Sequence, residues 1–265
     1  RSAAQHQRIL AVLLALALLV LSLLALLALR QAERVTQQLA ANGRALMQSQ
    51  RLAKAVSPAL VGIDAAFAEV KDSSAVLTST LNGLKNGDSS MGLSAVDDDQ
   101  AAELESAQPL IERTEASAKT LLEQQKLLVQ VGAAMRQINT LAGKLLERAE
   151  AVEVLKQQQA APTAEILATD QLVMLTQRIA RAASQFLTLE SVGQDTVAQI
   201  AKDLSRFREV ATGLRDGSAE LKLSAAKDAA LREHLDALLK VFEQVRSQAA
   251  PALANSKGLL AARAA

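Results

Sequence analysis

Apolar residues recur every seven positions over most of this chain, and this spacing is the feature that most restricts its fold. One register runs over residues 39–84, and others follow over 104–152, 172–214 and 231–259. A sustained period of 3.5 residues is typical of long helices that pack along a narrow seam. Ala, Leu, Val and Ile supply nearly all the apolar residues, because the chain has four Phe and no Trp, Tyr or Cys. The sequence therefore predicts an all-α protein rather than a sheet protein or an α/β enzyme.

An apolar block near the N-terminus predicts a transmembrane helix. It covers residues 9–29, lies between Arg8 and Arg30, and contains a single polar residue. At about 1.5 Å per residue the block just crosses the roughly 30 Å hydrocarbon core of a bilayer. It is also longer than the apolar region of a signal peptide. Because Arg1 and Arg8 precede the block, we expect residues 1–8 to be cytoplasmic, although basic residues also follow it.

The seven-residue registers predict four long helices after the membrane segment. Turn signals end the first and third helices at residues 85–88 and 216–218, and Pro162 separates the second from the third. Each helix has one apolar stripe that it cannot bury alone, so we expect a long antiparallel four-helix bundle, connected up, down, up, down. Kinks or weak points are expected at Pro58, Gly193 and Pro251.

The chain also contains an internal repeat. Residues 47–55 (MQSQRLAKA) match residues 174–182 (MLTQRIARA), and the turn sequence GLKNGD at 83–88 matches GLRDGS at 213–218. A motif and a turn that recur together indicate duplication.

The repeat predicts a bundle built from a duplicated helical hairpin. We expect the two hairpins to cover residues 30–158 and 159–265. The sequence begins with Arg and stops in a helical stretch at Ala265. We therefore expect it to be part of a longer protein in which a second transmembrane helix follows.

The repeated motif supplies the candidate ligand- or partner-binding residues. They are Arg44, Ser49, Gln50 and Arg51 in the first copy and Thr176, Gln177 and Arg178 in the second. Hydroxyl, amide and guanidinium groups around a bundle axis could bind an anion through charge-assisted hydrogen bonds. Two interpretations without a ligand stay open. The small hydroxyls could let helices approach while the arginines pair with carboxylates of neighbouring helices, or the polar residues could fix the register of the seam.

Other kinds of chemistry have little support in the sequence. Two histidines, His6 and His234, and no cysteine leave neither a nucleophile with a base nor a zinc site. The acidic run at residues 97–99 lacks the spacing of a calcium loop. The 29 basic and 28 acidic residues are interspersed, which argues against a nucleic-acid partner. We expect no catalytic residues, no metal and no cofactor.

The first motif and its position resemble a known family. Gly43–Lys54, placed shortly after a membrane helix, resembles the signature of the PilJ-type N-terminal sensory domain. This domain belongs to the methyl-accepting chemotaxis transducers that control type IV pili. Asp170–Arg181 resembles a further repeat of the same transducers, so the resemblance extends from about Val35 to the end of the chain.

The resemblance implies a homodimeric receptor in the inner membrane, with most of this chain in the periplasm and in contact with the major pilin. A missing cytoplasmic region would reach a kinase through a chemotaxis adaptor and control twitching motility. Related nitrate and nitrite sensor kinases bind their anion with an arginine directly before the motif methionine. Here that position is Leu46, and Val173 in the second copy, which argues against nitrate binding.

Two alternatives to the chemoreceptor stay open. One is the periplasmic domain of a sensor histidine kinase for a small anion. The other is a membrane-anchored coiled-coil scaffold, which would explain the heptads and the anchor but gives no reason for the duplicated motif.

Overall fold

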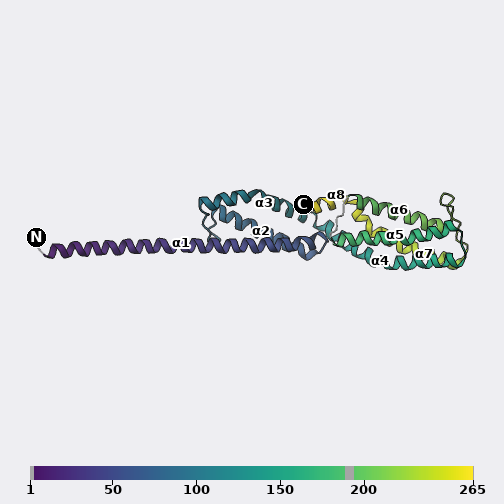
Figure 1. The fold of residues 1–265 in the computed structure, drawn as a ribbon, viewed down its shortest axis with the longest axis horizontal. Helices are drawn as coiled ribbons and strands as arrows, with labels where there is room; N and C mark the ends of the chain where they lie inside the picture. Colours follow the sequence, from purple (N-terminus) through teal and green to yellow (C-terminus); the bar gives the residue numbers. More distant parts are fainter. Residues whose placement is uncertain (1–2, 189–193, 265) are drawn as a thin grey trace. The chain divides into compact units, whose positions relative to one another are not determined.

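The computed structural model describes the backbone of residues 3–188 and 194–264, and within it the side chains of residues 16–97, 100–188 and 195–264. All regular structure in this part of the chain is helical (Figure 1). The helices are α1 (Ala3–Leu60), α2 (Asp64–Asn86), α3 (Asp98–Glu123), α4 (Gln125–Gln158), α5 (Thr163–Thr188), α6 (Gln194–Asp216), α7 (Ala229–Ala254) and α8 (Ser256–Ala264). They form two compact units. The first contains the chain up to Leu52 with Asp72–Glu115, and the second contains Ala53–Lys71 with the chain from Ala116 onwards.

In the first unit, α2 folds back along α1, and α3 joins the same core. Ala41 of α1 is buried together with Leu84 of α2 and Leu93 of the following turn, and Leu104 of α3 packs against this cluster. The small alanine side chain allows the helices to approach closely. The unit is therefore a small helical bundle at the C-terminal side of the apolar segment.

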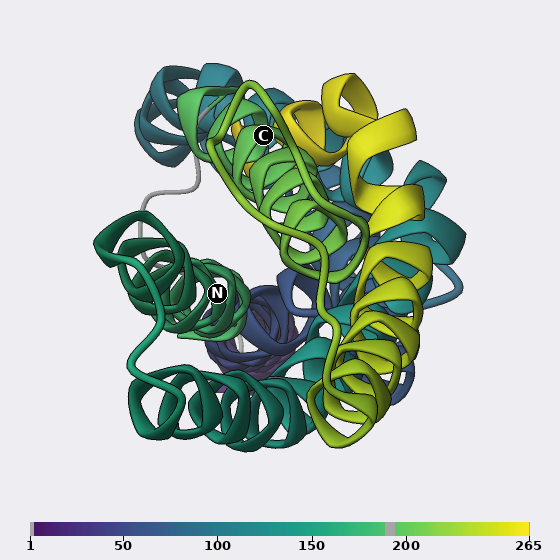
Figure 2. The same ribbon diagram turned by 90° about the vertical axis from the view of Figure 1, so that its right-hand side faces the viewer.

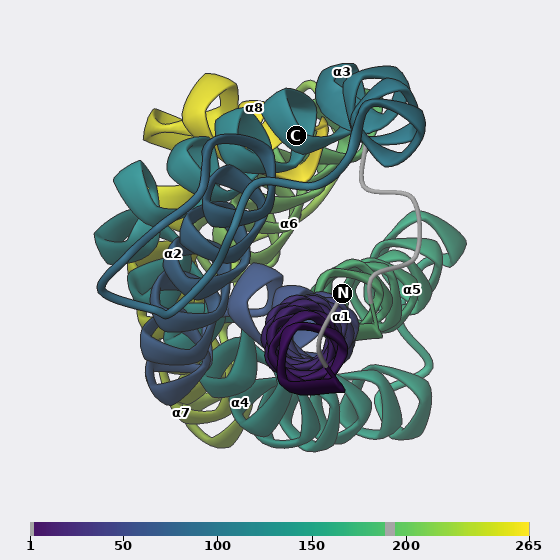
Figure 3. The same ribbon diagram turned by 90° about the vertical axis from the view of Figure 1, so that its left-hand side faces the viewer.

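The apolar segment of α1 extends beyond the other helices of its unit, and its described side chains, those of residues 16–29, do not pack against them. Figures 1 and 3 show the first part of α1 as a single projecting helix, which Figure 3 views along its axis. The leucines of residues 16–29 are exposed. Within the part of the chain that the structure describes, α1 is the one helix long and apolar enough to cross a membrane. The side chains of residues 9–15, which complete the predicted span, lie outside the described residues.

A sharp reversal at residues 61–63 separates α1 from α2. The amide of Ile63 donates to the carbonyl oxygen of Pro58 and that of Gly62 to the carbonyl oxygen of Ala59, each at 2.9 Å. These two bonds form a Schellman motif, which commonly ends a helix at a glycine with positive φ, here +77° at Gly62. The prediction of one helix through this point, kinked at Pro58, is wrong. Pro58 lies in the last turn of α1, and the glycine lets the chain turn back.

This reversal packs against α4 within the second unit, backbone against backbone. A Cβ atom at Gly132 of α4 would overlap the carbonyl oxygen of Val61, and one at Gly62 would overlap that of Leu128. Arg136 of α4 also donates to the carbonyl oxygens of Val61 (3.1 Å) and Gly62 (3.3 Å). Two glycines and one arginine thus fix the end of α1 on α4.

The second unit contains an antiparallel bundle of α4, α5, α6 and α7. In this bundle α4 and α6 each pack against both α5 and α7, so the four helices surround a common axis, as the end-on view of Figure 2 shows. Leu128, Leu172 and Leu238 are fully buried, and the rings of Phe207 and Phe242 stack with their centroids 4.7 Å apart. This arrangement confirms the predicted all-α helical bundle. Its four antiparallel helices are not the four predicted ones, however, because the predicted third helix supplies both α5 and α6.

The predicted third helix is also two helices that run in opposite directions. Arg178 of α5 lies beside Asp203 of α6, whereas the earlier residue Gln171 lies beside the later residue Arg206. Residues further along α5 therefore meet residues earlier in α6. The weak point predicted at Gly193 lies outside the described residues. The bundle helices are consequently shorter than predicted, and each predicted long helix is interrupted.

The predicted registers are correct for most of the bundle and wrong for α1. The members of the second, third and fourth registers that are buried are Ala118, Leu121, Leu128, Met135, Ala142, Leu145, Val152, Leu172, Ile179, Phe186, Phe207, Leu214, Leu231, Leu238, Val245, Ala252 and Leu259. In α1, however, Leu39 and Leu46 are 71% and 63% exposed, and Ala41, Ala45 and Leu52 are buried instead. The helix turns its small side chains inward and leaves the leucine stripe outward.

The duplication is visible in the structure. Helices α2 and α6 both have 23 residues, and α3 and α7 both have 26. The turn after α2 is closed by backbone bonds between Asp88 and Leu93 (2.9 and 2.8 Å), and the turn after α6 by bonds between Ser218 and Leu223 (both 2.9 Å). The two copies thus share helix lengths and turn geometry.

A second interruption follows the predicted kink at Pro251. The amide of Asn255 donates to the Pro251 carbonyl oxygen at 3.1 Å, α7 ends at Ala254, and α8 begins at Ser256. Arg263 of α8 donates to the Phe186 carbonyl oxygen at 2.8 Å and lies 4.2 Å above the centroid of its ring. Burial lowers the pKa of Arg263. This contact fastens α8 to the end of α5.

Candidate functional site

The first copy of the motif lies on α1 in the first unit. Arg44, Ser49, Gln50 and Arg51 are all exposed, whereas the neighbouring Gln48 is buried. Arg51 makes no ion pair with any residue that the structure describes. Ser49 was expected in a buried seam and instead shares the outward leucine stripe, because α1 packs through its alanines.

The second copy lies on α5 in the second unit and has different surroundings. Thr176 is buried, and its hydroxyl donates to the Leu172 carbonyl oxygen of its own helix at 2.9 Å. Gln177 and Arg178 are exposed. Arg178 pairs with Asp203 of α6 at 2.9 Å. The structural interpretation, an arginine paired with a carboxylate of a neighbouring helix, therefore holds for Arg178 but not for Arg51.

The Arg178–Asp203 pair lies in a groove between α5 and α6. The side chain of Asp203 is 8% exposed and also accepts a hydrogen bond from the amide of Gln199 at 2.8 Å. The groove has a volume of about 400 Å³, and Arg181 and Asp195 line it as well. The candidate residues of the first copy belong to the first unit, and those of the second copy belong to the second unit.

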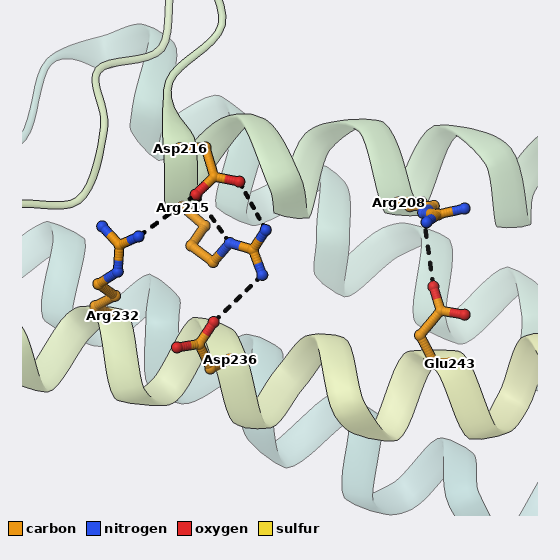
Figure 4. Close-up of polar contacts among 6 residues, drawn as sticks. All are labelled: Arg208, Arg215, Asp216, Arg232, Asp236 and Glu243. Carbon is orange, nitrogen blue, oxygen red and sulfur yellow. Dashed lines mark hydrogen bonds and ion pairs between the residues drawn. The ribbon is translucent and has the colours of Figure 1, made fainter.

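A chain of ion pairs on the other side of α6 joins this helix to α7 (Figure 4). Arg215 bridges Asp216 at 2.7 Å and Asp236 at 3.3 Å, and Arg208 lies 3.6 Å from Glu243. The hydrogen bonds from Arg215 hold the pKa of Asp216 below its ordinary value. Because these groups face solvent, each pair contributes little to stability. We infer that these ion pairs fix the position of α6 along α7.

The sequence comparisons agree with the position of the first motif. Residues 27–137 match the family described as type IV pili methyl-accepting chemotaxis transducer N-term, PilJ. This part of the chain is similar to a PilJ domain. The matched segment includes the first motif, the reversal after α1, and the turn after α2, so the resemblance noted from the sequence is confirmed for this segment. A comparison with curated proteins found no match.

The second motif lies beyond the segment that matches PilJ. Its relation to the PilJ segment rests on the shared motif, helix lengths and turn geometry. PilJ domains are non-enzymatic signalling domains of chemotaxis transducers. Residues 27–137 are therefore similar to a signalling segment of this kind.

The residue patterns did not predict Asp203, Gln199 and Asp195 as part of a site. A signal for the two carboxylates was present, because aligning the repeats by their turns places Asp203 opposite Ser73 and Asp195 opposite Ala65. At these two aligned positions only the second copy has a carboxylate, whereas the first copy has Asp64 and Asp72 one position earlier. Both motif copies have the arginine, but only the second has a carboxylate at position 203 beside it, so the two copies differ in chemistry here.

Proposed function

We propose that this chain is the periplasmic sensory region of an inner-membrane methyl-accepting chemoreceptor that controls type IV pili and twitching motility. The PilJ match over residues 27–137 is the observation that carries this proposal. In this proposal residues 1–8 are cytoplasmic, residues 9–29 cross the membrane, and contact with the major pilin or a ligand supplies the signal. The cytoplasmic output passes through a chemotaxis adaptor to a kinase.

The continuity of α1 supports a mechanism based on helix displacement. A single helix extends from the apolar segment to Leu60, and its last turn is fixed on α4 through Gly132 and Arg136. A slide or rotation of the reversal would therefore be transmitted along α1 without an intervening loop. Packed helix interfaces tend to have discrete arrangements, which suits a switch.

An insertion in α1 tests this mechanism. One residue inserted after Arg34 rotates the apolar segment by about 100° relative to the rest of the helix, whereas seven residues restore its phase to within about 20°. In the full-length receptor we expect the single insertion to fix twitching motility in one state and the seven-residue insertion to restore regulation. Motility is measured with receptor levels checked by immunoblot. Normal regulation by the single-insertion variant at normal abundance would contradict the rigid-helix mechanism.

We also propose that the exposed stripe of α1 forms the homodimer interface. Leu39 and Leu46 lie seven residues apart on an outward face that also carries Val35. Leucines at this spacing are the usual contacts of two parallel helices. Each contributes about 1.5–3 kcal/mol when it becomes buried, so leaving the stripe exposed is unfavourable outside a dimer.

Cysteine crosslinking tests the dimer directly, because the chain has no native cysteine. We expect Leu46→Cys and Leu39→Cys to form disulfide dimers in membranes under mild oxidation. Ala40→Cys is the matched control, since Ala40 is also exposed but lies about 100° around the helix from Leu39. Equal crosslinking at positions 40 and 46 would show collision rather than a specific interface and would contradict the proposed seam.

A further inference from the structure

We propose that the groove between α5 and α6 binds a small zwitterion of the α-amino-acid type. The groove volume of about 400 Å³ lies within the range of small-molecule sites, roughly 300–1,000 Å³. It lies within a single unit, so both of its walls belong to one compact part of the chain. This proposal deepens the sensory role proposed above and rests on it for its biological meaning.

The wall formed by α5 is cationic. Arg178 and Arg181 are three residues apart and so occupy the same face of the helix. Asp203 already neutralises Arg178 and fixes its guanidinium. Arg181 is exposed and makes no ion pair within the part of the chain that the structure describes. One guanidinium is therefore available to a carboxylate, and its fork of N–H donors suits that group.

The wall formed by α6 is anionic. Asp195 is exposed in the first turn of α6, and the structure shows no ion pair for it among the described residues. Gln199 and Asp203 follow on the same wall. Among the residues that the structure describes, the groove thus retains one cation and one anion without an ion pair on opposite walls, after the Arg178–Asp203 pair is taken into account.

This charge arrangement selects against simple ions. An anion held by Arg181 would meet the carboxylate of Asp195, and a cation held by Asp195 would meet the guanidinium of Arg181. A molecule with both an ammonium and a carboxylate satisfies both walls. Ala182 and Ile200 add an apolar part of the lining, suited to a small side chain, and Gln185 supplies an amide.

The comparison between the two copies supports a site specific to the second copy. Aligned by their turns and motifs, Asp195 and Asp203 correspond to Ala65 and Ser73, and Gln185 corresponds to Pro58. The basic residues are present in both copies, since Arg181 corresponds to Lys54. The second copy therefore combines the cations of the motif with carboxylates at positions 195 and 203, where the first copy has Ala65 and Ser73.

Calorimetry on the purified full chain in lipid nanodiscs tests the site. Each standard amino acid is titrated separately at up to about 5 mM, which covers millimolar dissociation constants. We expect at least one to bind with one site per chain. Its amide and its N-acetyl derivative each lack one charge and should bind at least about tenfold more weakly.

Two variants and two controls locate the binding. Arg181→Gln and Asp195→Asn should each weaken binding at least about tenfold. Both side chains are exposed and have no ion pair within the described part of the chain, so circular dichroism and thermal stability should be unchanged. The matched controls in the first copy, Lys54→Gln and Glu69→Gln, should bind as the wild type does.

Three results would overturn the proposal. The first is that no amino acid produces a heat of binding. The second is that both variants bind with the affinity of the wild type. The third is that the N-acetyl derivative binds as tightly as the amino acid, which would identify a simple anion site. None of these results affects the insertion experiment on α1, so failure of the binding site and failure of the transducer function can be distinguished.

Discussion

Replacing Glu165 by alanine should lower the free energy of unfolding of the second unit by about 3–5 kcal/mol. The Nζ atom of Lys156 lies 2.6 Å from Glu165 Oε2, and each side chain is 5% exposed. The other carboxylate oxygen accepts from the backbone amide of Ser224 at 3.2 Å. Removing the carboxylate leaves a buried ammonium without a counter-charge and frees the turn after α6. Urea denaturation followed by circular dichroism at pH 7 measures the loss.

Two controls separate the buried pair from ordinary surface charge. The double variant Lys156→Met, Glu165→Leu should recover most of the lost stability, because an apolar pair of similar volume replaces a buried ion pair at little cost. Glu243→Ala, which removes a 39% exposed carboxylate that pairs with Arg208 and Arg246, should cost at most about 1 kcal/mol. A loss below about 1 kcal/mol for Glu165→Ala would mean that the pair is solvated, contrary to the structure.

The pH dependence of the same variant has a definite sign. Burial by itself would raise the pKa of Glu165, but the hydrogen bonds from Lys156 and the Ser224 amide, with the lysine charge, outweigh burial and lower it. A lowered pKa contributes stability above the unfolded carboxyl pKa, about 4.3. That contribution is lost as the pH falls through the folded value. The stability gap between wild type and Glu165→Ala should therefore stay constant from about pH 7 to 5 and shrink below about pH 4.

The seven-residue spacing predicted the helices but not their changes of direction. The register continues across the reversal, since Phe67, Val70 and Leu84 of α2 were assigned correctly and are buried. A helix that continues and a helix that folds back show the same apolar spacing. The signal that distinguishes them was Gly62, whose positive φ allows the reversal, and it is a single residue among many.

The buried face of α1 could not be chosen from apolar spacing alone. The helix has two stripes, one with Leu39 and Leu46 and one with Ala41, Ala45 and Leu52. Hydrophobicity favours the leucines as a core, but the structure buries the alanines. Small side chains permit close approach within a chain, and the leucine stripe stays available for a second chain.

The candidate site was predicted in part. The repeated motif led to Arg178, which does line the groove between α5 and α6. Its partner Asp203 was missed, because the pairing exists only when α6 folds back along α5. The partner of Arg178 thus depends on how the helices fold back on one another. The seven-residue spacing predicted α5 and α6 as one continuous helix, in which Arg178 and Asp203 could not meet.

Gly132→Ala should destabilise the second unit by at least about 2 kcal/mol, since the added Cβ overlaps the Val61 carbonyl oxygen and must push the reversal away from α4. Gly143→Ala is the matched control in the same helix. A Cβ there meets nothing within 4 Å, so the higher helix propensity of alanine should stabilise the protein by about 0.5–1 kcal/mol. Hydrogen exchange should also show faster exchange at the Gly62 and Ile63 amides in Gly132→Ala alone. If both variants were stabilised, the backbone contact would be absent, and with it the fixed point on which the proposed helix-displacement mechanism depends.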